Sequence, residues 1–333
     1  MSRTGRPVVI AADGGGTKTD LVVVSTDGEL LSHARGAGAR PQIDGPESAM
    51  RSLTGLRDEA LARLEEPVDV VRAQVYLAGM DFPSHILEAE ALLADWPVDV
   101  VDNDIFALLR SGTAAGSAVA VVCGTGINAV GVRQGWPDVR FPALGEFSGD
   151  WGGGTFLGGQ ALWHAVRSED GRGPATALQA AVSEALGHPR LTDAIEALYG
   201  TEEQQAALGS LCPVLFDVAE AGDAVAMAVV DRLADELVTM AVSILARLEL
   251  TGAEVPVVLG GGVLAARRPQ LMAGIDDRMR ERAPHARTEL VTAPPVLGAG
   301  LLALGAIGAG AAAERRYEAE VLTRNWSSLG VVV

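Results

Sequence analysis

Lysine is almost absent from this sequence. Lys18 is the only lysine among the 26 basic residues, and the rest are arginine. High alanine, glycine and arginine usage is typical of a GC-rich coding sequence, which explains the arginine background. The single lysine nevertheless lies beside a glycine run, in the segment DGGGTKT at 13–19. Its position makes Lys18 a candidate functional residue.

Cysteine is also scarce. The chain has two, Cys123 and Cys212, which excludes a disulfide framework and any four-cysteine metal site. We therefore expect a cytoplasmic protein. The histidines are scattered and show no metal-ligand spacing; they are His33, His85, His164, His188 and His285.

Long apolar runs and excess positive charge are missing as well. The most apolar stretch, 294–313, is rich in glycine and alanine and predicts a closely packed core helix rather than a membrane span. The N-terminus leads directly into a predicted strand and shows no signal-peptide pattern. A net charge of -17 argues against nucleic acid and anionic membranes as partners. It does not exclude a nucleotide, because backbone amides, a metal ion and one or two cations can hold phosphate locally.

With 333 residues, the chain is expected to form two domains. Apolar runs predict three antiparallel strands at its start, with Asp27-Gly28 as a hairpin turn. A helical stripe of Met50, Leu53, Leu56, Ala60 and Leu64 follows, and then strands and helices alternate. The predicted order is β-β-β-α-β-α-β-α.

The same order recurs from Gly116, with extra helices inserted. Strands are expected near 117–126, 127–135 and 139–145, followed by helices that include 154–169 and 224–250. The predicted domains are 1–115, completed by a C-terminal helix at about 296–312, and 116–295. The repetition lies in the order of elements and not in residue identities.

Three glycine-rich loops lie at comparable points of the two units. The loop at 13–19 lacks the glycine before lysine and the following helix that a Walker A loop requires, so it predicts a tight hairpin whose amides can approach an anion. The sequence CGTGIN at 123–128 occupies the matching hairpin of the second unit. LGGGVL at 259–264 joins a strand to a helix. Glycine hairpins that bind nothing are the alternative for each loop taken alone.

Together these motifs resemble the sugar kinase, actin and heat-shock chaperone superfamily. DGGGTKT, CGTG and LGGGV resemble its two phosphate motifs and its adenosine motif. VDND, GTGIN, SGDWGGG and APPVLGAGLLAL resemble the N-acetylglucosamine kinase branch, which also holds the activator ATPases of benzoyl-CoA reductase and 2-hydroxyacyl-CoA dehydratase. The resemblance extends to about residue 310. It implies an α/β fold with two ribonuclease-H-like, actin-like ATPase domains around an interdomain ATP cleft.

The resemblance assigns ATP and Mg²⁺ as cofactors. Asp13 is expected to hold Mg²⁺, through water, since Mg²⁺ keeps its waters; a turn-forming aspartate is the alternative. Lys18 is expected to reach the β- or γ-phosphate as a compact charge. The other expected nucleotide-binding residues are Gly14, Gly15, Gly16, Thr17, Thr19, Gly124, Thr125, Gly126, Gly260, Gly261 and Gly262.

The resemblance also implies a catalytic base and substrate contacts. Asp104 is expected to be the base and to contact the substrate; a plain helix N-cap is the alternative, and a helix N-terminus would lower its pKa. Asn128 and Asp150 are expected to bind the sugar, although Asn128 could instead be a hairpin residue. The sequence departs from the family pattern at two places, and both bear on which sugar is bound. Trp151 stands where the family has an acid, and could stack on a sugar or belong to the core. The loop with Arg40, Gln42 and Asp44 lacks the usual asparagine.

The implied function is ATP-dependent phosphorylation of an amino sugar, with N-acetylglucosamine and its 6-hydroxyl as first choice. Glucosamine, N-acetylmannosamine, a muramyl sugar or a nucleoside are other acceptors. An activator ATPase is a second reading, disfavoured because neither cysteine has a suitable context for an iron–sulfur cluster. A non-catalytic sugar sensor is the third. A homodimer is the assembly that the resemblance suggests.

Overall fold

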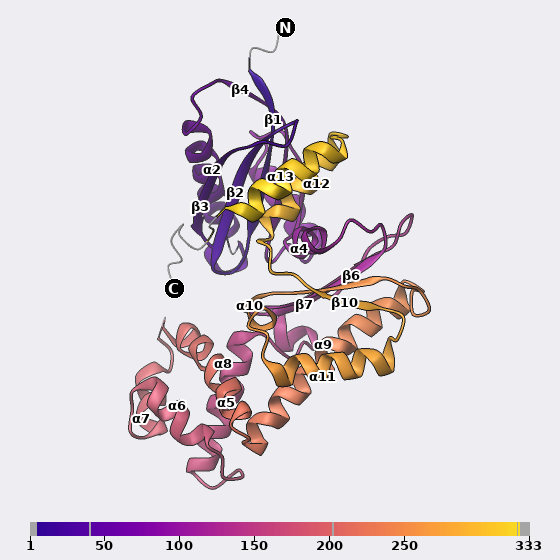
Figure 1. Ribbon diagram of the computed structural model, residues 1–333. Helices are drawn as coiled ribbons and strands as arrows, with labels where there is room; N and C mark the ends of the chain where they lie inside the picture. Colours follow the sequence, from indigo (N-terminus) through magenta and orange to yellow (C-terminus); the bar gives the residue numbers. More distant parts are fainter. Residues whose placement is uncertain (1–4, 40, 202, 325, 327–333) are drawn as a thin grey trace. The chain divides into compact units, whose positions relative to one another are not determined.

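The computed structural model describes residues 5–39, 41–201, 203–324 and 326, and the chain divides into two compact units (Figure 1). Unit 1 comprises 1–120 and 291–333, and unit 2 comprises 121–290. The domain boundaries predicted from the sequence, 115/116 and 295/296, lie about five residues from the observed unit boundaries. The last segment of the chain therefore returns to the unit in which the chain begins.

Unit 1 is built on a five-stranded sheet in the order β3-β2-β1-β4-β5. Strands β1, β2 and β3 are antiparallel, and β4 and β5 run parallel to β1. β-branched residues suit a pleated, half-buried surface and recur in β1, β2 and β4. The strands are β1 Arg6–Gly14, β2 Lys18–Ser25, β3 Leu30–Ala37, β4 Val68–Leu77 and β5 Val98–Asn103.

Helices cover both faces of this sheet. On one face α2 (Pro46–Ala62) buries Met50, Leu53, Leu56 and Ala60 of the predicted stripe, and α3 (Pro83–Leu92) packs in the same cluster. The fifth member, Leu64, lies beyond the end of α2 and is partly buried. On the other face lie α4 (Ile105–Gly112) and the C-terminal helices. The short helix α1, Pro41–Asp44, precedes α2. This arrangement confirms the predicted order of strands and helices in the first unit.

The C-terminal segment forms two helices where one was predicted. Helix α12 is Val296–Ala306, and after Gly308, with φ 71°, the chain continues as α13, Ala311–Thr323. Tyr317 of α13 is fully buried, and its hydroxyl donates to the Val296 carbonyl at 2.8 Å. Figure 1 shows both helices against the strands of unit 1. Helix α13, which lies beyond residue 310, thus contributes to the core of that unit.

Unit 2 repeats the sheet, in the order β10-β9-β6-β7-β8. The strands are β6 Ala118–Cys123, β7 Ile127–Val132, β8 Val139–Arg140, β9 Pro256–Gly260 and β10 Arg287–Leu290. The strand predicted at 139–145 is only two residues long, because Pro142 has no N–H to pair and Ala143 adopts φ 54°. The repeated order confirms two ribonuclease-H-like domains.

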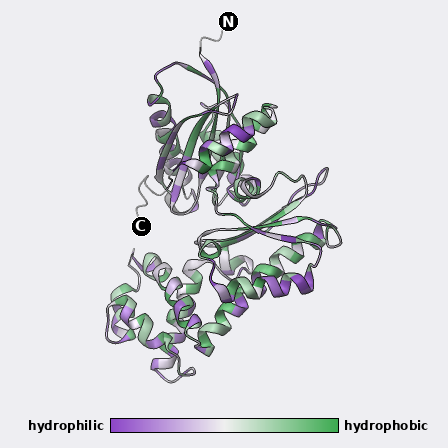
Figure 2. Ribbon diagram, in the orientation of Figure 1, coloured by the Kyte–Doolittle hydropathy of each residue, from purple (hydrophilic) through white to green (hydrophobic). Residues whose placement is uncertain are grey.

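Seven helices and a 3₁₀ turn complete the described part of unit 2. Helices α7 and α8 were not predicted; Pro213 inside α8 argued against a helix there. None of the described helices is both long and apolar enough to cross a membrane. Figure 2 shows hydrophobic residues following the strands of each unit. The helices are α5 Gly154–Glu169, α6 Leu178–Leu186, α7 Leu191–Leu198, α8 Gln204–Glu220, α9 Ala224–Arg247, α10 Gly262–Ala265 and α11 Pro269–Arg282, and the 3₁₀ turn is η1 Gly145–Ser148.

Candidate active site

A row of polar residues crosses the sheet of unit 1 near the carboxyl end of β1. Asp13 pairs in register with Asp20 on β2 and with Tyr76 on β4. Asp20 in turn pairs with Arg35 on β3, and Tyr76 with Asp102 on β5. Neighbours in register project from the same face of a sheet. The register therefore brings together charged residues that are far apart in the sequence.

Asp13 is the most deeply placed acid of the expected site. Its side chain is 6 % exposed, and among the described residues no group donates a hydrogen bond to it. Burial raises the pKa of Asp13 well above its usual value; the negative charges of Asp104 and Asp20 add to this, and Lys18 opposes it. A buried carboxylate without a donor is a group that a cation would stabilise. Asp13 therefore fits its expected role toward Mg²⁺.

The first glycine loop is a tight hairpin, as predicted. The Gly15 amide donates to the Lys18 carbonyl at 2.9 Å, which leaves Gly16 and Thr17 at the tip. An added Cβ on Gly14 would lie 2.5 Å from Cδ2 of Leu77, so the Leu77 side chain would have to move. The Gly15 amide is engaged within the hairpin, so any phosphate contact must come from the tip amides.

Side chains of β2 alternate between the two faces of the sheet. Lys18 and Asp20 share the face of Asp13, whereas Thr19 projects from the opposite one. Thr19 is 1 % exposed, and its hydroxyl has no hydrogen-bond partner among the described residues. Only its backbone is thus positioned to contribute to the expected loop.

Asp104 lies between β5 and α4. Its backbone amide donates to the Leu77 carbonyl at 3.3 Å, and its side chain makes no capping hydrogen bond. Asn103 serves that purpose, since its Oδ1 accepts from the Ile105 amide at 3.1 Å. Asp104 thus occupies the N-cap position of α4, whereas the side chain that caps the helix is that of Asn103.

The predicted direction of the Asp104 pKa is also wrong. Burial raises this pKa to about 7; the negative charge of Asp81 adds to the effect, and backbone hydrogen bonds oppose it. Asp81 is held beside the site by Asn103, whose Nδ2 donates to Asp81 Oδ1 at 2.8 Å. Desolvation outweighs the helix N-terminus here. A carboxylate that ionises near neutral pH suits general base catalysis.

The sequence analysis did not single out Asp20, Asn103 or Asp81. Asp20 is fully buried and accepts hydrogen bonds from His33 and Arg35, both at 2.7 Å. Burial would raise the pKa of Asp20, but these hydrogen bonds outweigh it and lower the pKa. An aspartate inside an apolar strand was the available signal, but its partners become visible only through the sheet register.

The glycine segments of unit 2 pack backbone against backbone. An added Cβ on Gly153 would lie 2.6 Å from Cα of Gly126, and one on Gly261 would lie 2.5 Å from the carbonyl carbon of Cys123. Both glycines have positive φ, 89° and 93°. The Gly154 amide at the start of α5 donates to the Gly124 carbonyl at 2.7 Å. Residues 152–154 thus pack against the hairpin at 123–128. The sequence analysis included these residues in the SGDWGGG motif but gave them no role.

This packing leaves some of the expected amides available and engages others. The Gly124 amide donates to the Gly126 carbonyl at 2.9 Å, so it closes the hairpin and is not free for phosphate. An added Cβ on Gly126 or Gly262 would meet nothing within 4 Å. Gly260 ends β9, and Gly262 begins α10. The loop therefore offers open backbone at Gly126 and Gly262, beside the closely packed Gly153 and Gly261.

The expected sugar-binding residues lie in the same unit. Asn128 is on β7, and its Oδ1 accepts from the Ala129 amide at 2.7 Å. Asp150 follows η1, and its Oδ2 accepts from the Ser148 hydroxyl at 2.6 Å. Trp151 is partly exposed rather than a core residue, with Arg232 4.3 Å from the centre of its ring. The indole thus has one neighbour that stacks on it already.

The loop that departs from the family pattern is only partly visible. Arg40 and the side chain of Asp44 lie outside the described residues. Gln42 donates a hydrogen bond to the Gly79 carbonyl. Gly79 has φ 84°, and the segment that follows it carries Asp81. Gln42 therefore braces the loop that leads to the Asp104 neighbourhood.

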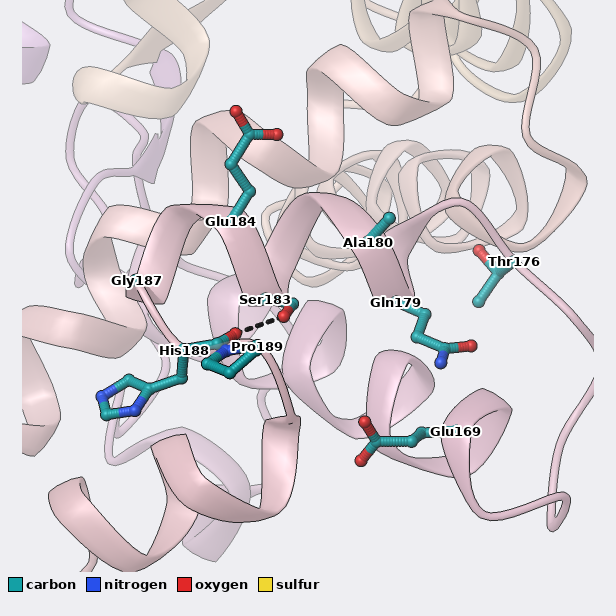
Figure 3. Close-up of a pocket in the computed structure, with 9 residues that line it drawn as sticks. All are labelled: Glu169, Thr176, Gln179, Ala180, Ser183, Glu184, Gly187, His188 and Pro189. Carbon is teal, nitrogen blue, oxygen red and sulfur yellow. Dashed lines mark hydrogen bonds between the residues drawn. The ribbon is translucent and has the colours of Figure 1, made fainter.

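A cavity of about 610 Å³ lies elsewhere in unit 2, along α6 (Figure 3). Glu169, Gln179, Glu184 and His188 are among its lining residues, and the Ser183 hydroxyl donates to the His188 carbonyl. None of the residues expected to bind nucleotide or sugar lines it. Among the described residues, no group of three or more His, Cys, Asp and Glu side chains is arranged to hold a metal ion. The cavity is therefore separate from the expected chemistry.

Comparison with known proteins decides the family. A family model described as the BadF/BadG/BcrA/BcrD ATPase family matches residues 12–303. The chain belongs to this ATPase family. The match includes both glycine hairpins, the segment at 259–264 and Asp104.

Two curated relatives and one solved structure are similar over most of this ATPase's length. It is 26 % identical to an N-acetyl-D-glucosamine kinase of Dictyostelium discoideum, over 90 % of this chain and 98 % of the relative. It is 26 % identical to an N-acetylmuramic acid/N-acetylglucosamine kinase of Clostridium acetobutylicum, over 77 % and 85 %. A structure from Chromobacterium violaceum, named as a candidate N-acetylglucosamine kinase, superposes with a TM-score of 0.72 at 22 % identity and covers 90 % of this chain and 99 % of that one. The last comparison supports the fold.

The residues present fit ATP and Mg²⁺. Tip amides, open backbone at Gly126 and the partly exposed Lys18 suit phosphate groups. Asp13 supplies one buried carboxylate, and Mg²⁺ is commonly held by one or two carboxylates together with substrate phosphates and water. A dedicated protein cage for the metal is not needed.

Proposed function

We propose that this ATPase-family protein is an ATP-dependent sugar kinase that phosphorylates N-acetylglucosamine on its 6-hydroxyl. The observation that carries the proposal is Asp104, a partly exposed carboxylate whose pKa is about 7 and whose charge acts on Asp13 of the same unit. A carboxylate poised in this way can accept a proton from a sugar hydroxyl at neutral pH. The similarity to N-acetylglucosamine kinases supports the same conclusion.

The chain's own residues take distinct parts in the reaction. Asp104 accepts the proton of the attacking hydroxyl. Lys18 and the tip amides of the first hairpin would offset charge on the phosphates, and Asp13 would hold the metal ion. Bound MgATP supplies the phosphoryl group and the divalent charge that stabilises its transfer. Positioning and charge compensation account for most of the expected rate gain.

The acceptor is recognised by polar groups of unit 2. We assign Asn128 and Asp150 to sugar hydroxyls, because an amide donates and accepts whereas a carboxylate accepts only. The names of the two curated relatives favour N-acetylglucosamine, and one of them adds N-acetylmuramic acid. Other amino sugars are the alternative acceptors. Trp151, already stacked with Arg232, has an edge contact with Phe156 at 5.0 Å between ring centres.

An activator ATPase is the alternative that the family name keeps open. Such a role would need cysteine thiolates that can hold a cluster. Both cysteines are buried, and burial raises the pKa of Cys123 to about 12 and that of Cys212 to about 11. Buried, protonated thiols are poor metal ligands. This observation favours the kinase.

The test is ADP release with MgATP across a panel of glucose, glucosamine, N-acetylglucosamine, N-acetylmannosamine and N-acetylmuramic acid. Turnover that depends on one amino sugar and is lost in Asp104→Asn supports the proposal. ATP hydrolysis that is indifferent to every sugar contradicts it. Three further expectations stay predictions: both glycine hairpins act on one nucleotide, the protein is a homodimer, and it is cytoplasmic.

A further inference from the structure

A buried charge network lies beside Asp13. The Asp20 carboxylate accepts from His33 Nε2 at 2.7 Å, and from Arg35 Nε and Nη2 at 2.7 and 3.0 Å. The side chains of these three residues are 1 %, 2 % and 7 % exposed. Arg35 thus forms a bidentate hydrogen-bonded ion pair with the Asp20 carboxylate, which is a strong geometry for such a pair.

Lys18 is a fourth and different partner of this network. Its Nζ lies 3.8 Å from Asp20 Oδ2, beyond hydrogen-bond length, and its side chain is 43 % exposed. Lys18 and Asp20 are two residues apart on β2 and so project from the same face. The lysine is attracted by the carboxylate and still reaches water. It can leave without uncovering a buried, unpaired charge.

The C-terminal segment closes the network from outside. The Trp326 carbonyl accepts from Arg35 Nη1 at 2.8 Å, and the indole lies edge-on to the His33 ring at 4.7 Å between centres. Glu320 of α13 accepts from the Leu30 amide at the start of β3 at 2.8 Å. The Trp326 carbonyl thus holds the Arg35 guanidinium beside Asp20, and the Glu320 hydrogen bond joins α13 to β3.

We propose that Asp20 and Arg35 are positioning residues for Lys18. Asp20 keeps the ammonium group at the foot of the first glycine hairpin, and Arg35 neutralises Asp20 so that Lys18 can move to a nucleotide phosphate. The proposal rests on the nucleotide site of the proposed function. It assigns to Asp20 and Arg35 the control of how readily Lys18 can bind a phosphate.

Arg35 is expected to matter because two anions, the Asp20 carboxylate and the nucleotide phosphate, compete for the Lys18 ammonium group. With Arg35 in place, Asp20 has its hydrogen bonds satisfied and attracts Lys18 only weakly. Without Arg35, Asp20 has one neighbour fewer to balance it, and Lys18 would have to replace the lost cation, because an unpaired buried carboxylate is costly. Removing Arg35 should therefore weaken phosphate binding through Lys18, although Arg35 itself makes no contact with the hairpin tip in our assignment.

The experiment is a double-mutant cycle on nucleotide binding. Wild type, Arg35→Met, Lys18→Ala and the double variant are titrated with a non-hydrolysable ATP analogue and Mg²⁺, with the dissociation constant as readout. We expect Arg35→Met to weaken binding at least about fivefold in the wild-type background and less than about twofold when Lys18 is already alanine. A structural role of Arg35 predicts the same factor in both backgrounds, and that result would overturn the proposal.

A second pair of variants keeps the test decisive if Arg35→Met folds poorly. Asp20→Asn/Arg35→Met removes both charges and retains an acceptor for His33, so it should bind the analogue more tightly than Arg35→Met, or fold where that variant does not. Binding as weak as in Arg35→Met, with a folded protein, contradicts the proposal.

The matched control is another ion pair of the same unit. Arg110 and Glu314 join α4 to α13 at 2.6 Å and are 21 % and 29 % exposed. Arg110→Met should leave analogue binding within about twofold of wild type. Wild-type protein that binds no nucleotide refutes the proposed function itself. Normal binding with an additive cycle refutes only the role of Arg35.

Discussion

The two glycine hairpins lie at equivalent points of the same fold but are built by different forces. The hairpin of unit 1 is surrounded by charge, with Asp13, Lys18 and Asp20 on one face of its strands. The hairpin of unit 2 is surrounded by backbone, with Gly153 and Gly261 packed too closely for any side chain. The first resists change through electrostatics, and the second through lack of space.

This difference indicates how the repeated fold divides its tasks. We expect unit 1 to carry the groups that gain or lose protons and attract cations, and unit 2 to contribute the peptide groups of its hairpin together with the polar side chains of Asn128 and Asp150. Charged side chains can be tuned by their neighbours, as the raised pKa values of Asp13 and Asp104 show. A closely packed glycine has no such adjustable property, because any added side chain collides with neighbouring backbone. Substitutions in the two units should therefore fail in different ways.

Asp104→Asn should have the largest effect, because it removes the proposed base from the charged unit. We expect turnover to fall by about 10²–10⁴-fold, with nucleotide binding retained. Steady-state kinetics with N-acetylglucosamine measures the first quantity, and titration with an ATP analogue measures the second. Asn103→Ala is an informative comparison, since it removes the helix cap and the Asp81 contact but leaves the carboxylate. Near-normal turnover in Asp104→Asn would refute the assignment.

Gly261→Ala should be the most damaging change in the closely packed unit. The added methyl would meet backbone at 2.5 Å, and φ 93° disfavours alanine, so we expect a loss of about 2–4 kcal/mol of stability. Its neighbour Gly262 is the control, because a methyl there meets nothing within 4 Å and α10 begins at this residue. Chemical denaturation compares the two variants. Equal stabilities would contradict close packing as the basis of this hairpin.

The raised pKa of Asp104 gives activity and stability opposite dependences on pH. Folded Asp104 binds its proton up to about pH 7, whereas the unfolded group releases it near 3.8, so stability declines as pH rises between these values. Asp104→Asn should thus be more stable than wild type at pH 8, by about 2 kcal/mol or less since solvent reaches the group. Thermal unfolding at pH 5 and pH 8 measures the difference. The wild-type kcat/KM should rise with pH toward a plateau above about pH 7. A variant less stable than wild type at pH 8 would contradict the raised pKa.

Tyr317→Phe should have the smallest effect. It removes one hydrogen bond to the Val296 carbonyl and leaves the ring in place, which predicts a loss of about 1 kcal/mol and unchanged kinetics. Urea denaturation and kinetics at saturating substrate measure both. A strong loss of activity would mean that α13 acts directly on the site of unit 1.

Several elements could be predicted because their signals are local. The glycine runs predicted both hairpins, and a 3.6-residue stripe predicted α2 with Met50, Leu53, Leu56 and Ala60 buried. Helices α7, α8 and α13 were missed. They are short, contain a proline or follow a glycine break, and their stability comes from packing rather than from pattern.

The sequence by itself determined the order of the strands and the place of each glycine loop, and the family resemblance added the candidate roles of Asp13, Lys18 and Asp104. Alternation and glycine content are encoded within a few residues, so they can be read in one dimension. Only the tertiary structure decided that Asp104 has a raised pKa, that Gly124 closes its own hairpin, and that Asp20 meets Arg35 and His33. Burial and strand register depend on residues far away in the chain, and these set the charge of the site.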